Sequence, residues 1–259
     1  MFKNKDKYIE KINYNKTVAL IPARGGSKGV VKKNIQILRK YPLIAYSVVA
    51  ARLSTQIDRV IVTTDSQEIA EVALKYGAEI PFIRPKEYAT DVSGDIAFVE
   101  HFIKFAAENE GTIPEYIVHL RPTTPLRDVE IMDRAILECK RNKDCCSLRS
   151  GHKASESPYK WFLKNKDGYF KPLSDKITND EANLGRQSFP DVYIPDGYVD
   201  VLKSDYIIQN DILHGENMLG YESPYCQEVD TLDDLELLRY ELNKNQSALY
   251  RKIEELENG

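Results

Sequence analysis

The chain has 259 residues and a formal net charge of −4, from 36 Lys and Arg against 40 Asp and Glu. Its composition, 42% hydrophobic and 29% charged, is that of a globular protein and excludes collagen-like and largely disordered chains. The acidic balance argues against a general nucleic-acid binder, which needs a basic surface. It leaves room for a local basic pocket that holds a small phosphorylated ligand.

The sequence carries no targeting or membrane signal. No apolar run approaches the roughly 18–20 residues that span a membrane. Residues 1–16 are polar and Lys-rich, without the apolar centre of a secretory signal. We therefore expect an N-terminal extension over 1–16, a cytoplasmic location, and no membrane or nucleic-acid partner. The cysteines show no C-x-x-C spacing, so we expect reduced thiols rather than a zinc site or disulfides.

Strand-like and helix-like segments alternate from residue 17 to about residue 150. Short apolar runs predict strands at 17–22, 59–64, 80–83, 116–120 and 145–148, and amphipathic segments predict helices at 41–53, 66–77, 93–109 and 128–141. This alternation predicts an α/β fold with a mostly parallel central sheet. Ligands of such sheets bind beyond the carboxyl ends of the strands, where residues 24–28, 63–65 and 121–124 fall.

The pattern changes after residue 150. Residues 151–196 are rich in Tyr, Pro, Asn, Asp and Lys, with weak periodicity, which predicts an inserted arm built on a β-hairpin. A strand over 197–202 and a helical region over 231–256 follow. We therefore expect one domain over 17–259 that carries the arm as an insertion.

A glycine-rich loop follows the first predicted strand. Its sequence, Ala23-Arg24-Gly25-Gly26-Ser27-Lys28-Gly29, has neither the P-loop spacing nor the G-x-G-x-x-G spacing. It still suits a polyphosphate, because the glycines let backbone N–H groups approach the oxygens while Arg24 and Lys28 add charge and Ser27 adds a donor. The alternative is a basic turn that binds nothing.

The loop is the first of an ordered set of motifs. In chain order these are Ile21-Pro-Ala-Arg24-Gly-Gly-Ser27-Lys28-Gly29 with Lys33-Asn34, Val62-Thr-Thr-Asp65, Arg84-Pro85 with Ala89-Thr-Asp91, Leu120-Arg-Pro-Thr-Thr-Pro-Leu-Arg127, Gly185-Arg186-Gln187, Pro195-Asp196-Gly197 and Glu228-Val229-Asp230-Thr231. The set spans about residues 17–240 and resembles the sialic-acid-type cytidylyltransferases, the CMP-N-acetylneuraminate and legionaminate synthetase family. One such motif alone is weak evidence, whereas their common order is specific.

The resemblance implies a Rossmann-like nucleotidyltransferase fold with a protruding dimerisation arm. It implies transfer of CMP from CTP to the anomeric hydroxyl of a nonulosonic, sialic-acid-like 2-keto sugar acid, with release of pyrophosphate, for surface glycan synthesis. It also implies Mg²⁺ as the cofactor and a homodimer in which the arm reaches the partner's site. The 16 Tyr residues, against 8 Phe, fall partly in the arm, which favours an interface there.

The resemblance also assigns candidate site residues. The catalytic candidates are Arg24, Lys28 and Asp230. The nucleotide-binding candidates come from three segments of the chain: Ala23, Arg24, Gly25, Gly26, Ser27, Lys28, Asn34, Arg84, Asp91, Arg121, Thr123 and Thr124. The sugar-binding candidates are Lys160, Arg186, Gln187, Asp196 and Asp200, of which the two cations would meet the carboxylate of the sugar acid.

The metal candidates are Glu228 and Asp230. On a strand, their i, i+2 spacing would put both carboxylates on one face, and two hard oxygen ligands suit Mg²⁺. One of these carboxylates, or a metal-bound water, would then take the proton of the sugar hydroxyl. The alternative is that both are solvated charges at the end of a strand.

Two places depart from the family pattern and leave alternatives open. Arg121 stands where Gln is usual, and because Arg only donates, it could face O2 and N3 of cytosine or O6 and N7 of guanine. Asp196 and Asp200 stand where Asn-Gly-x-x-Tyr is common, and could pair with an amino group or accept from sugar hydroxyls. We favour cytosine from the whole pattern. The alternatives are another base or acceptor, such as GTP or the octulosonic acid Kdo, and a catalytically silent nucleotide-binding protein.

Overall fold

The structure is a computed structural model that describes residues 2–26, 29–90, 94–244 and 247–258. Within these ranges the chain forms a six-stranded sheet in the order β10-β6-β9-β5-β1-β4. The strands are β1 (Ile12–Pro22), β4 (Arg59–Thr63), β5 (Ile113–His119), β6 (Ser147–Lys153), β9 (Tyr193–Lys203) and β10 (Met218–Glu222). β9 runs antiparallel to both of its neighbours, and the other pairs are parallel. The predicted α/β fold with a mostly parallel sheet is confirmed.

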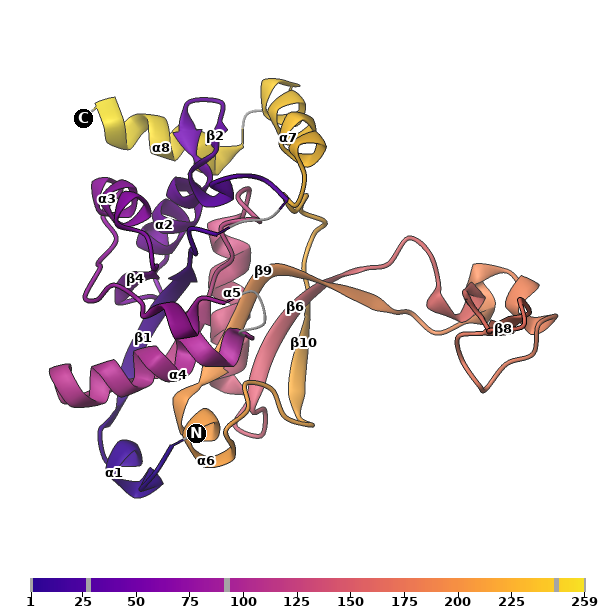
Figure 1. Cartoon of the computed structure of the whole chain (residues 1–259), viewed down its shortest axis with the longest axis horizontal. Helices are drawn as coiled ribbons and strands as arrows, with labels where there is room; N and C mark the ends of the chain where they lie inside the picture. The colour runs from indigo at the N-terminus through magenta and orange to yellow at the C-terminus, as the bar shows by residue number, and fades with distance from the viewer. Residues whose placement is uncertain (1, 27–28, 91–93, 245–246, 259) are drawn as a thin grey trace.

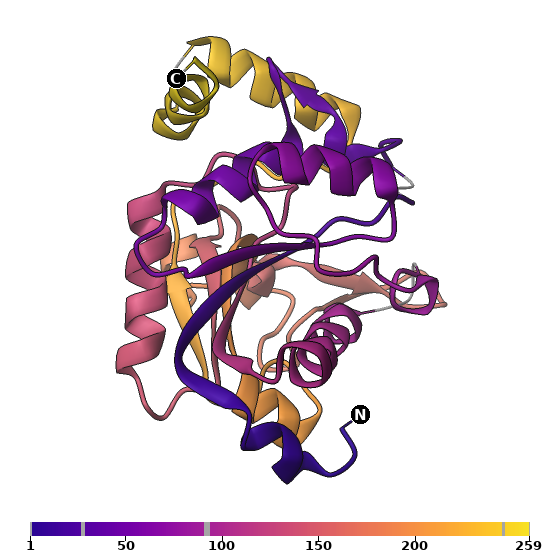
Figure 2. The same ribbon diagram turned by 90° about the vertical axis from the view of Figure 1, so that its left-hand side faces the viewer.

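Helices cover both faces of this sheet (Figures 1 and 2). On one face pack α2 (Leu43–Leu53), α3 (Gln67–Lys75), α5 (Val129–Arg141), α7 (Leu232–Lys244) and α8 (Ala248–Asn258). On the other face pack α4 (Asp95–Phe105) and α6 (Ser204–Asn210), with α1 (Lys5–Ile9) beside them. No helix within the described residues is both long and apolar enough to cross a membrane.

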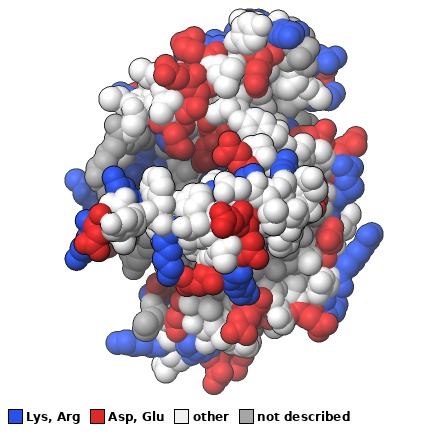
Figure 3. All heavy atoms as spheres, turned by 90° about the vertical axis from the view of Figure 1, so that its right-hand side faces the viewer, with Lys and Arg blue, Asp and Glu red and all other residues white. Residues whose placement is uncertain are grey.

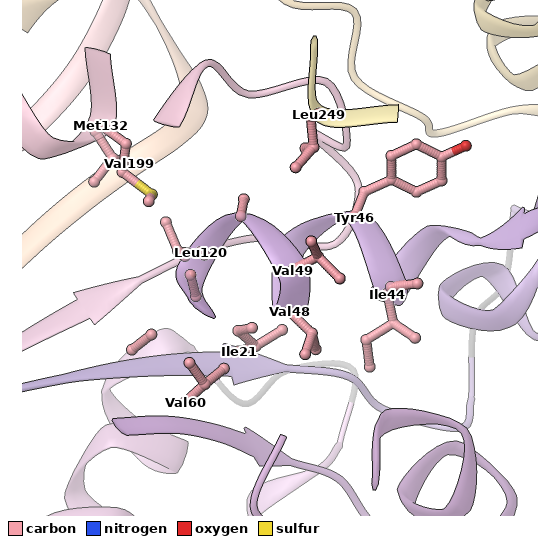
Figure 4. Packing of buried hydrophobic residues seen from close by; sticks show 14 of the residues in the cluster. Ile21, Ile44, Tyr46, Val48, Val49, Val60, Leu120, Met132, Val199 and Leu249 are labelled. Atoms are coloured by element: carbon pink, nitrogen blue, oxygen red, sulfur yellow. The ribbon is translucent and has the colours of Figure 1, made fainter. Parts of the chain in front are cut away.

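The two faces explain the continuous apolar runs of the central strands. Because successive side chains of a strand point to opposite faces, Ala19 and Ile21 of β1 join one buried cluster while Val18 and Leu20 join the other. Figure 4 shows the first cluster, with Val48 of α2 directed toward Ile21 on the sheet. The core therefore has two layers of apolar side chains, one on each face of the sheet. Together they hold β1, β4 and β5 in place, so that the carboxyl ends of these strands lie at one edge of the sheet.

The prediction of an N-terminal extension over residues 1–16 is wrong. β1 begins at Ile12, well before residue 17, and pairs with β5. Phe2 is 5% exposed, and its N–H donates to Asp211 at 3.0 Å. Polar residues between the two buried parts of β1 hid this strand in the sequence, because their side chains are exposed.

Three further differences separate the structure from the sequence-based elements. Residues 80–83 form no strand, and only an isolated bridge joins Ile61 to Glu79. The helical region over 231–256 is two helices, α7 and α8. The sequence patterns predicted neither α6 nor β10. β10 was missed because it is an edge strand in which alternate residues are exposed.

Between β6 and β9 the chain leaves the sheet as a projecting arm, residues 154–192 (Figure 1). It carries a short antiparallel hairpin of β7 (Phe162–Lys164) and β8 (Phe170–Pro172). Its exposed large apolar side chains are Trp161, Phe162, Leu163, Tyr169, Phe170, Leu173 and Leu184. Figure 3, which looks at the molecule from the arm side, shows charges of both signs interspersed over this face.

Arg127 is a buried guanidinium that joins the end of β5 to β9. It is 1% exposed, and its Nη1 donates to Ser47 Oγ at 2.8 Å. Its Nη2 donates to the carbonyl oxygens of Gly197, at 3.0 Å, and of Arg121. Burial lowers the pKa of Arg127 to about 10, so the group is still charged at neutral pH. This brace fixes the loop after β5 against the start of β9.

Candidate functional site

A cleft of about 500 Å³ lies at the carboxyl ends of β1 and β5, the edge where ligands of open α/β sheets bind. Its lining comes from segments that are far apart in the sequence: Pro22, Arg24, Gly29, Lys33, Asn34, Arg84, Tyr88, Ala89, Thr90, Asp95, Phe98, Arg121, Pro122, Thr123 and Asp230. The strand ends therefore bring the loop after β1, the segment after β4 and the loop after β5 to one place.

The cleft collects many of the predicted site residues. Those that line it are Arg24, Asn34, Arg84, Arg121, Thr123 and Asp230. The predicted residues Ser27, Lys28 and Asp91 lie outside the described residues. Ala23 and Thr124 are buried behind the lining, where they hold the loops through hydrogen bonds to Thr63 and Asp196.

Among the lining residues with charged or aromatic side chains, sequence reasoning missed four: Lys33, Tyr88, Asp95 and Phe98. Lys33 stands in the Lys33-Asn34 motif, so its basic side chain next to a predicted ligand contact was an available signal. Asp95 and Phe98 lie in the first turn of α4, and nothing in their local sequence indicates that this turn faces the cleft.

The lining carries more positive than negative charge. Its cations are Arg24, Lys33, Arg84 and Arg121, and its anions are Asp95 and Asp230. Four cations minus two anions leaves a formal +2 among the described lining residues. Lys33 Nζ lies 2.9 Å from Asp230 Oδ1, and Arg121 Nη2 lies 2.6 Å from Asp95 Oδ2. The other two cations of the lining, Arg24 and Arg84, come from the segments that follow β1 and β4.

Arg84 is a buried cation that donates to no carboxylate of the described residues. It is 4% exposed, and its Nε has no hydrogen-bond partner among the described residues. Its guanidinium lies 5.8 Å from the centre of the Phe98 ring. Burial lowers the pKa of Arg84, and the charge of Asp65 opposes this effect. Because an unpaired buried charge is costly, an anion that enters the cleft gains a strong partner here.

Two hydrogen bonds fix the described part of the loop after β1 beside the cleft. The N–H of Gly25 donates to Asp65 Oδ1 at 2.8 Å, and Asn34 Nδ2 donates to the carbonyl oxygen of Arg24 at 3.0 Å. Asn34 therefore braces the loop through this amide group. At Gly29 a β-carbon would lie 2.7 Å from the carbonyl oxygen of Asp230, so only glycine lets the loop approach that segment.

The predicted metal pair is only partly assembled. Residues 228–230 do not form a strand, contrary to our expectation, although the N–H of Val229 donates to the Thr123 carbonyl at 2.8 Å. Glu228 accepts from Thr123 Oγ1 at 2.9 Å and does not line the cleft, whereas Asp230 does. The described residues hold no cluster of three or more His, Cys, Asp or Glu side chains suited to a metal. Asp230 alone still fits an ion that takes its other ligands from phosphates and water.

Two of the sugar-binding candidates are buried in the sheet. Asp196 is 4% exposed and accepts from Ser150 Oγ at 2.7 Å, from the Tyr198 N–H at 3.0 Å and from the Ser223 hydroxyl. Its carboxylate is thus used inside the protein, where it fixes the start of β9. Asp200 is 3% exposed, and like Asp196 it does not line the cleft within the described chain.

The other sugar-binding candidates lie in the arm. Lys160 donates to the carbonyl oxygen of Leu184 at 2.9 Å, and Arg186 donates to that of Ala154 at 2.6 Å. The arm projects from the sheet (Figure 1), and none of Lys160, Arg186 and Gln187 is among the described residues that line the cleft. A role for them at a cleft therefore needs a second copy of the chain.

A family profile described as Cytidylyltransferase matches residues 18–258. The chain belongs to this family. It is 32% identical over 198 residues to the post-translational flagellin modification protein B of Campylobacter coli, across 76% of this chain and 81% of that protein. It is 30% identical over 251 residues to the N-acylneuraminate cytidylyltransferase of Escherichia coli O18:K1:H7, across 92% of this chain. The chain spans 55% of that relative's length.

A third relative is the pseudaminic acid cytidylyltransferase of Campylobacter jejuni, which is 39% identical over 120 residues. The match covers 46% of this chain and 51% of that protein. The family match confirms the predicted resemblance and makes the protein a nucleotidyltransferase.

Solved structures confirm the fold of this family member. A CMP:2-keto-3-deoxy-manno-octonic acid synthetase complexed with CTP matches with a TM-score of 0.64 at 15% identity, over 88% of this chain and 99% of that one. A cytidylyltransferase from Leptospira borgpetersenii matches with a TM-score of 0.57 at 16% identity, over 95% and 96% of the two chains. The predicted nucleotidyltransferase fold is therefore present.

The buried guanidinium of Arg84 yields a test that needs no knowledge of the substrate. The Arg84→Met variant should bind inorganic tripolyphosphate at least about tenfold more weakly than the wild type, because it lacks a partly desolvated cation. Isothermal titration calorimetry measures the affinities. Lys86→Met, which removes an exposed cation from the same segment, serves as the control. Equal affinities for the wild type and Arg84→Met would show that this cation does not hold the anion.

Proposed function

We propose that this family member transfers CMP from CTP to the anomeric hydroxyl of a nonulosonic, sialic-acid-like 2-keto sugar acid and releases pyrophosphate. The observation that carries this proposal is the cleft itself, at the carboxyl edge of a cytidylyltransferase fold, with four cations and two anions among its described lining residues and the buried Arg84 guanidinium, whose Nε has no partner among them. The names of the relatives, which include N-acylneuraminate and pseudaminic acid cytidylyltransferases, support the acceptor class.

The triphosphate would lie over the ends of β1 and β4. Arg24 and Arg84 would offset its charge, and Lys28 and Ser27 of the same loop remain predicted contacts. Lys33 neutralises Asp230 in the free protein, and a phosphate oxygen can replace that carboxylate as its partner. Positioning and charge stabilisation supply most of the acceleration in such transfers, so these side chains are the main source of catalysis.

Arg121 would contribute to recognition of the base. One of its nitrogens is engaged by Asp95, and its side chain packs on Gly197, where a β-carbon would lie 2.7 Å from Arg121 Cδ. Gly197 has a φ of +63°, so glycine suits this position for both reasons. The remaining N–H donors of Arg121 suit the O2 and N3 acceptors of cytosine.

Asp230 is the residue that would hold Mg²⁺, together with oxygen atoms of the triphosphate. Its side chain is 68% exposed and lines the cleft, so it is accessible to an ion that arrives with the nucleotide. The ion would neutralise the pyrophosphate as it leaves. Glu228 orients Thr123 by accepting its hydroxyl hydrogen bond, and it would not contact the ion directly.

The arm would complete the site from a second copy of the chain. Its exposed aromatic side chains, among them Trp161, Tyr169 and Phe170, are the groups that protein interfaces bury. A homodimer formed through these side chains would bring Lys160, Arg186 and Gln187 of each arm toward the acceptor side of the partner's cleft.

Pyrophosphate release tests the proposed function. We expect turnover with CTP and at least one acid from a panel of N-acetylneuraminic, legionaminic and pseudaminic acids and Kdo. GTP, ATP and UTP should give much lower rates. Equal or faster turnover with GTP would contradict the cytosine assignment, which Arg121 alone leaves open. CTP binding without pyrophosphate release from any combination would favour a catalytically silent protein.

The same assay includes two variants that test the metal assignment. Asp230→Asn should lower kcat at least about 100-fold, because the carboxylate that holds the ion is gone. Asp233→Asn, a neighbouring exposed carboxylate in the first turn of α7, should leave kcat unchanged. Full activity of Asp230→Asn would remove the metal assignment.

The arm gives a separate prediction on assembly. Sedimentation velocity should show a dimer for the wild type and a monomer for Phe170→Asp, because a charge would be buried in the apolar contact. The monomer should be at least about tenfold less active if the partner's arm completes the site. Lys166→Asp places the same charge in the exposed turn of the hairpin and should leave the dimer intact. A monomeric wild type with full activity would contradict the shared site.

A further inference from the structure

Three charged or titratable side chains lie in one row across β5, β9 and β6. In the sheet register, His119 of β5 is opposite Asp200 of β9, and Asp200 is opposite Arg149 of β6. They point to the face covered by α4, since the rings of His119 and Phe98 lie 5.2 Å apart in edge contact. Arg149 is level with His119, the last residue of β5, and β6 continues to Lys153 before the arm begins.

Arg149 is held in place by a buried carboxylate. Its Nε donates to Asp200 Oδ1 at 3.0 Å and its Nη2 donates to Oδ2 at 2.9 Å. This bidentate pairing with a carboxylate fixes the orientation of the guanidinium. Burial acts to raise the pKa of Asp200, but its contacts with His119 and Arg149 outweigh this effect and keep that pKa well below its ordinary value. Asp200 is therefore a permanent anion near neutral pH.

The pairing leaves part of Arg149 available. The side chain of Arg149 is 26% exposed, against 4% for that of Asp200. Nη1 of Arg149 has no hydrogen-bond partner in the part of the chain that the structure describes. One end of the guanidinium is thus fixed by the sheet, and the other end presents donors to solvent.

Asp95 connects this pair to the cleft. Asp95 lines the cleft and accepts from Arg121 at 2.6 Å. Its charge also acts on Arg149, whose pKa is raised first by the hydrogen bond with Asp200 and further by the charge of Asp95. Arg149 is not among the described residues that line the cleft, but it stands two strands from β5, on the sheet face that His119 shares with Phe98, and Phe98 does line the cleft.

The order of strands separates Arg149 from the phosphate side. Arg84 follows β4 and Arg24 follows β1, whereas Arg121 follows β5 and Arg149 lies on β6, across β9. A nucleotide whose triphosphate contacts Arg24 and Arg84 would leave the flank beside β9 and β6 for the second substrate.

We propose that Arg149 is a specificity-determining residue for the acceptor and donates from Nη1 to an uncharged oxygen of the sugar acid, a hydroxyl or an acyl-amide carbonyl. This inference rests on the proposed function. Asp200 neutralises Arg149 and Arg121 neutralises Asp95, so this flank has balanced charge. An ion pair without net charge favours a neutral polar group of the substrate. The carboxylate of the substrate would instead be attracted to a site with net positive charge.

Steady-state kinetics of Arg149→Lys test the proposal. Lysine keeps a cation beside Asp200 and so keeps the fold, but it has no second nitrogen in the position of Nη1 to donate to the substrate. With the panel acid that the wild type turns over fastest, we expect the KM for the acid to rise about tenfold, while the KM for CTP changes less than about twofold. Lys153→Met, which removes an exposed cation from the same strand, should change neither KM.

The outcomes separate the two proposals. Wild-type turnover with an unchanged acceptor KM in Arg149→Lys overturns the role of Arg149 alone. An equal rise of both KM values also overturns it, because a merely structural role moves both substrates. The double variant Arg149→Gln with Asp200→Asn, which pairs two neutral amides, should also show the acceptor-specific rise. A wild type that turns over no acid with CTP overturns the proposed function and this inference with it.

Discussion

The cleft depends on one buried guanidinium, that of Arg84, which has no carboxylate within hydrogen-bond distance among the described residues. Arg84 is 4% exposed and lies over the Phe98 ring, and the more distant charge of Asp65 opposes the effect of its burial. Keeping such a charge unpaired costs free energy, which the two hydrophobic clusters on the faces of the sheet must offset. A bound anion would remove that cost, which is why the proposed triphosphate site is placed at Arg84.

The charged side chains in and beside the cleft fall into two groups. Arg24 and Arg84, from the segments after β1 and β4, line one part of the cleft, and Arg121 pairs with Asp95 in another. Arg149 and Asp200 form a second ion pair farther along the sheet, on β6 and β9. Buried Arg127 fixes the loop after β5 against the start of β9, between the two groups. One sheet edge can therefore hold a polyanion on one side and a polar, less charged molecule on the other.

Local sequence was sufficient for the central strands and for much of the phosphate side. The apolar runs of β4 and β5 and the glycine-rich loop are local signals, and Arg24 and Arg84 stand in motifs beside them. The start of β1 was missed because exposed polar residues interrupt its apolar pattern.

The acceptor side could not be predicted in the same way. Arg149 meets Asp200 through the register of strands that are far apart in the sequence, and Asp95 reaches the cleft through the placement of α4. For Asp196 the sequence misled in the opposite direction. Its place in a family motif suggested contact with a ligand, whereas its carboxylate accepts hydrogen bonds from Ser150 and Tyr198 within the sheet. Such pairings depend on tertiary packing, which single-sequence patterns do not contain.

If the cleft joins the α-phosphate of CTP to a sugar acid, phosphorus NMR of the reaction mixture will show it most directly. With CTP, Mg²⁺ and a nonulosonic acid, we expect the three CTP resonances to give way to one phosphodiester resonance and an equal molar amount of pyrophosphate. Formation of CDP with orthophosphate, or an unchanged CTP spectrum with every acid, would contradict it.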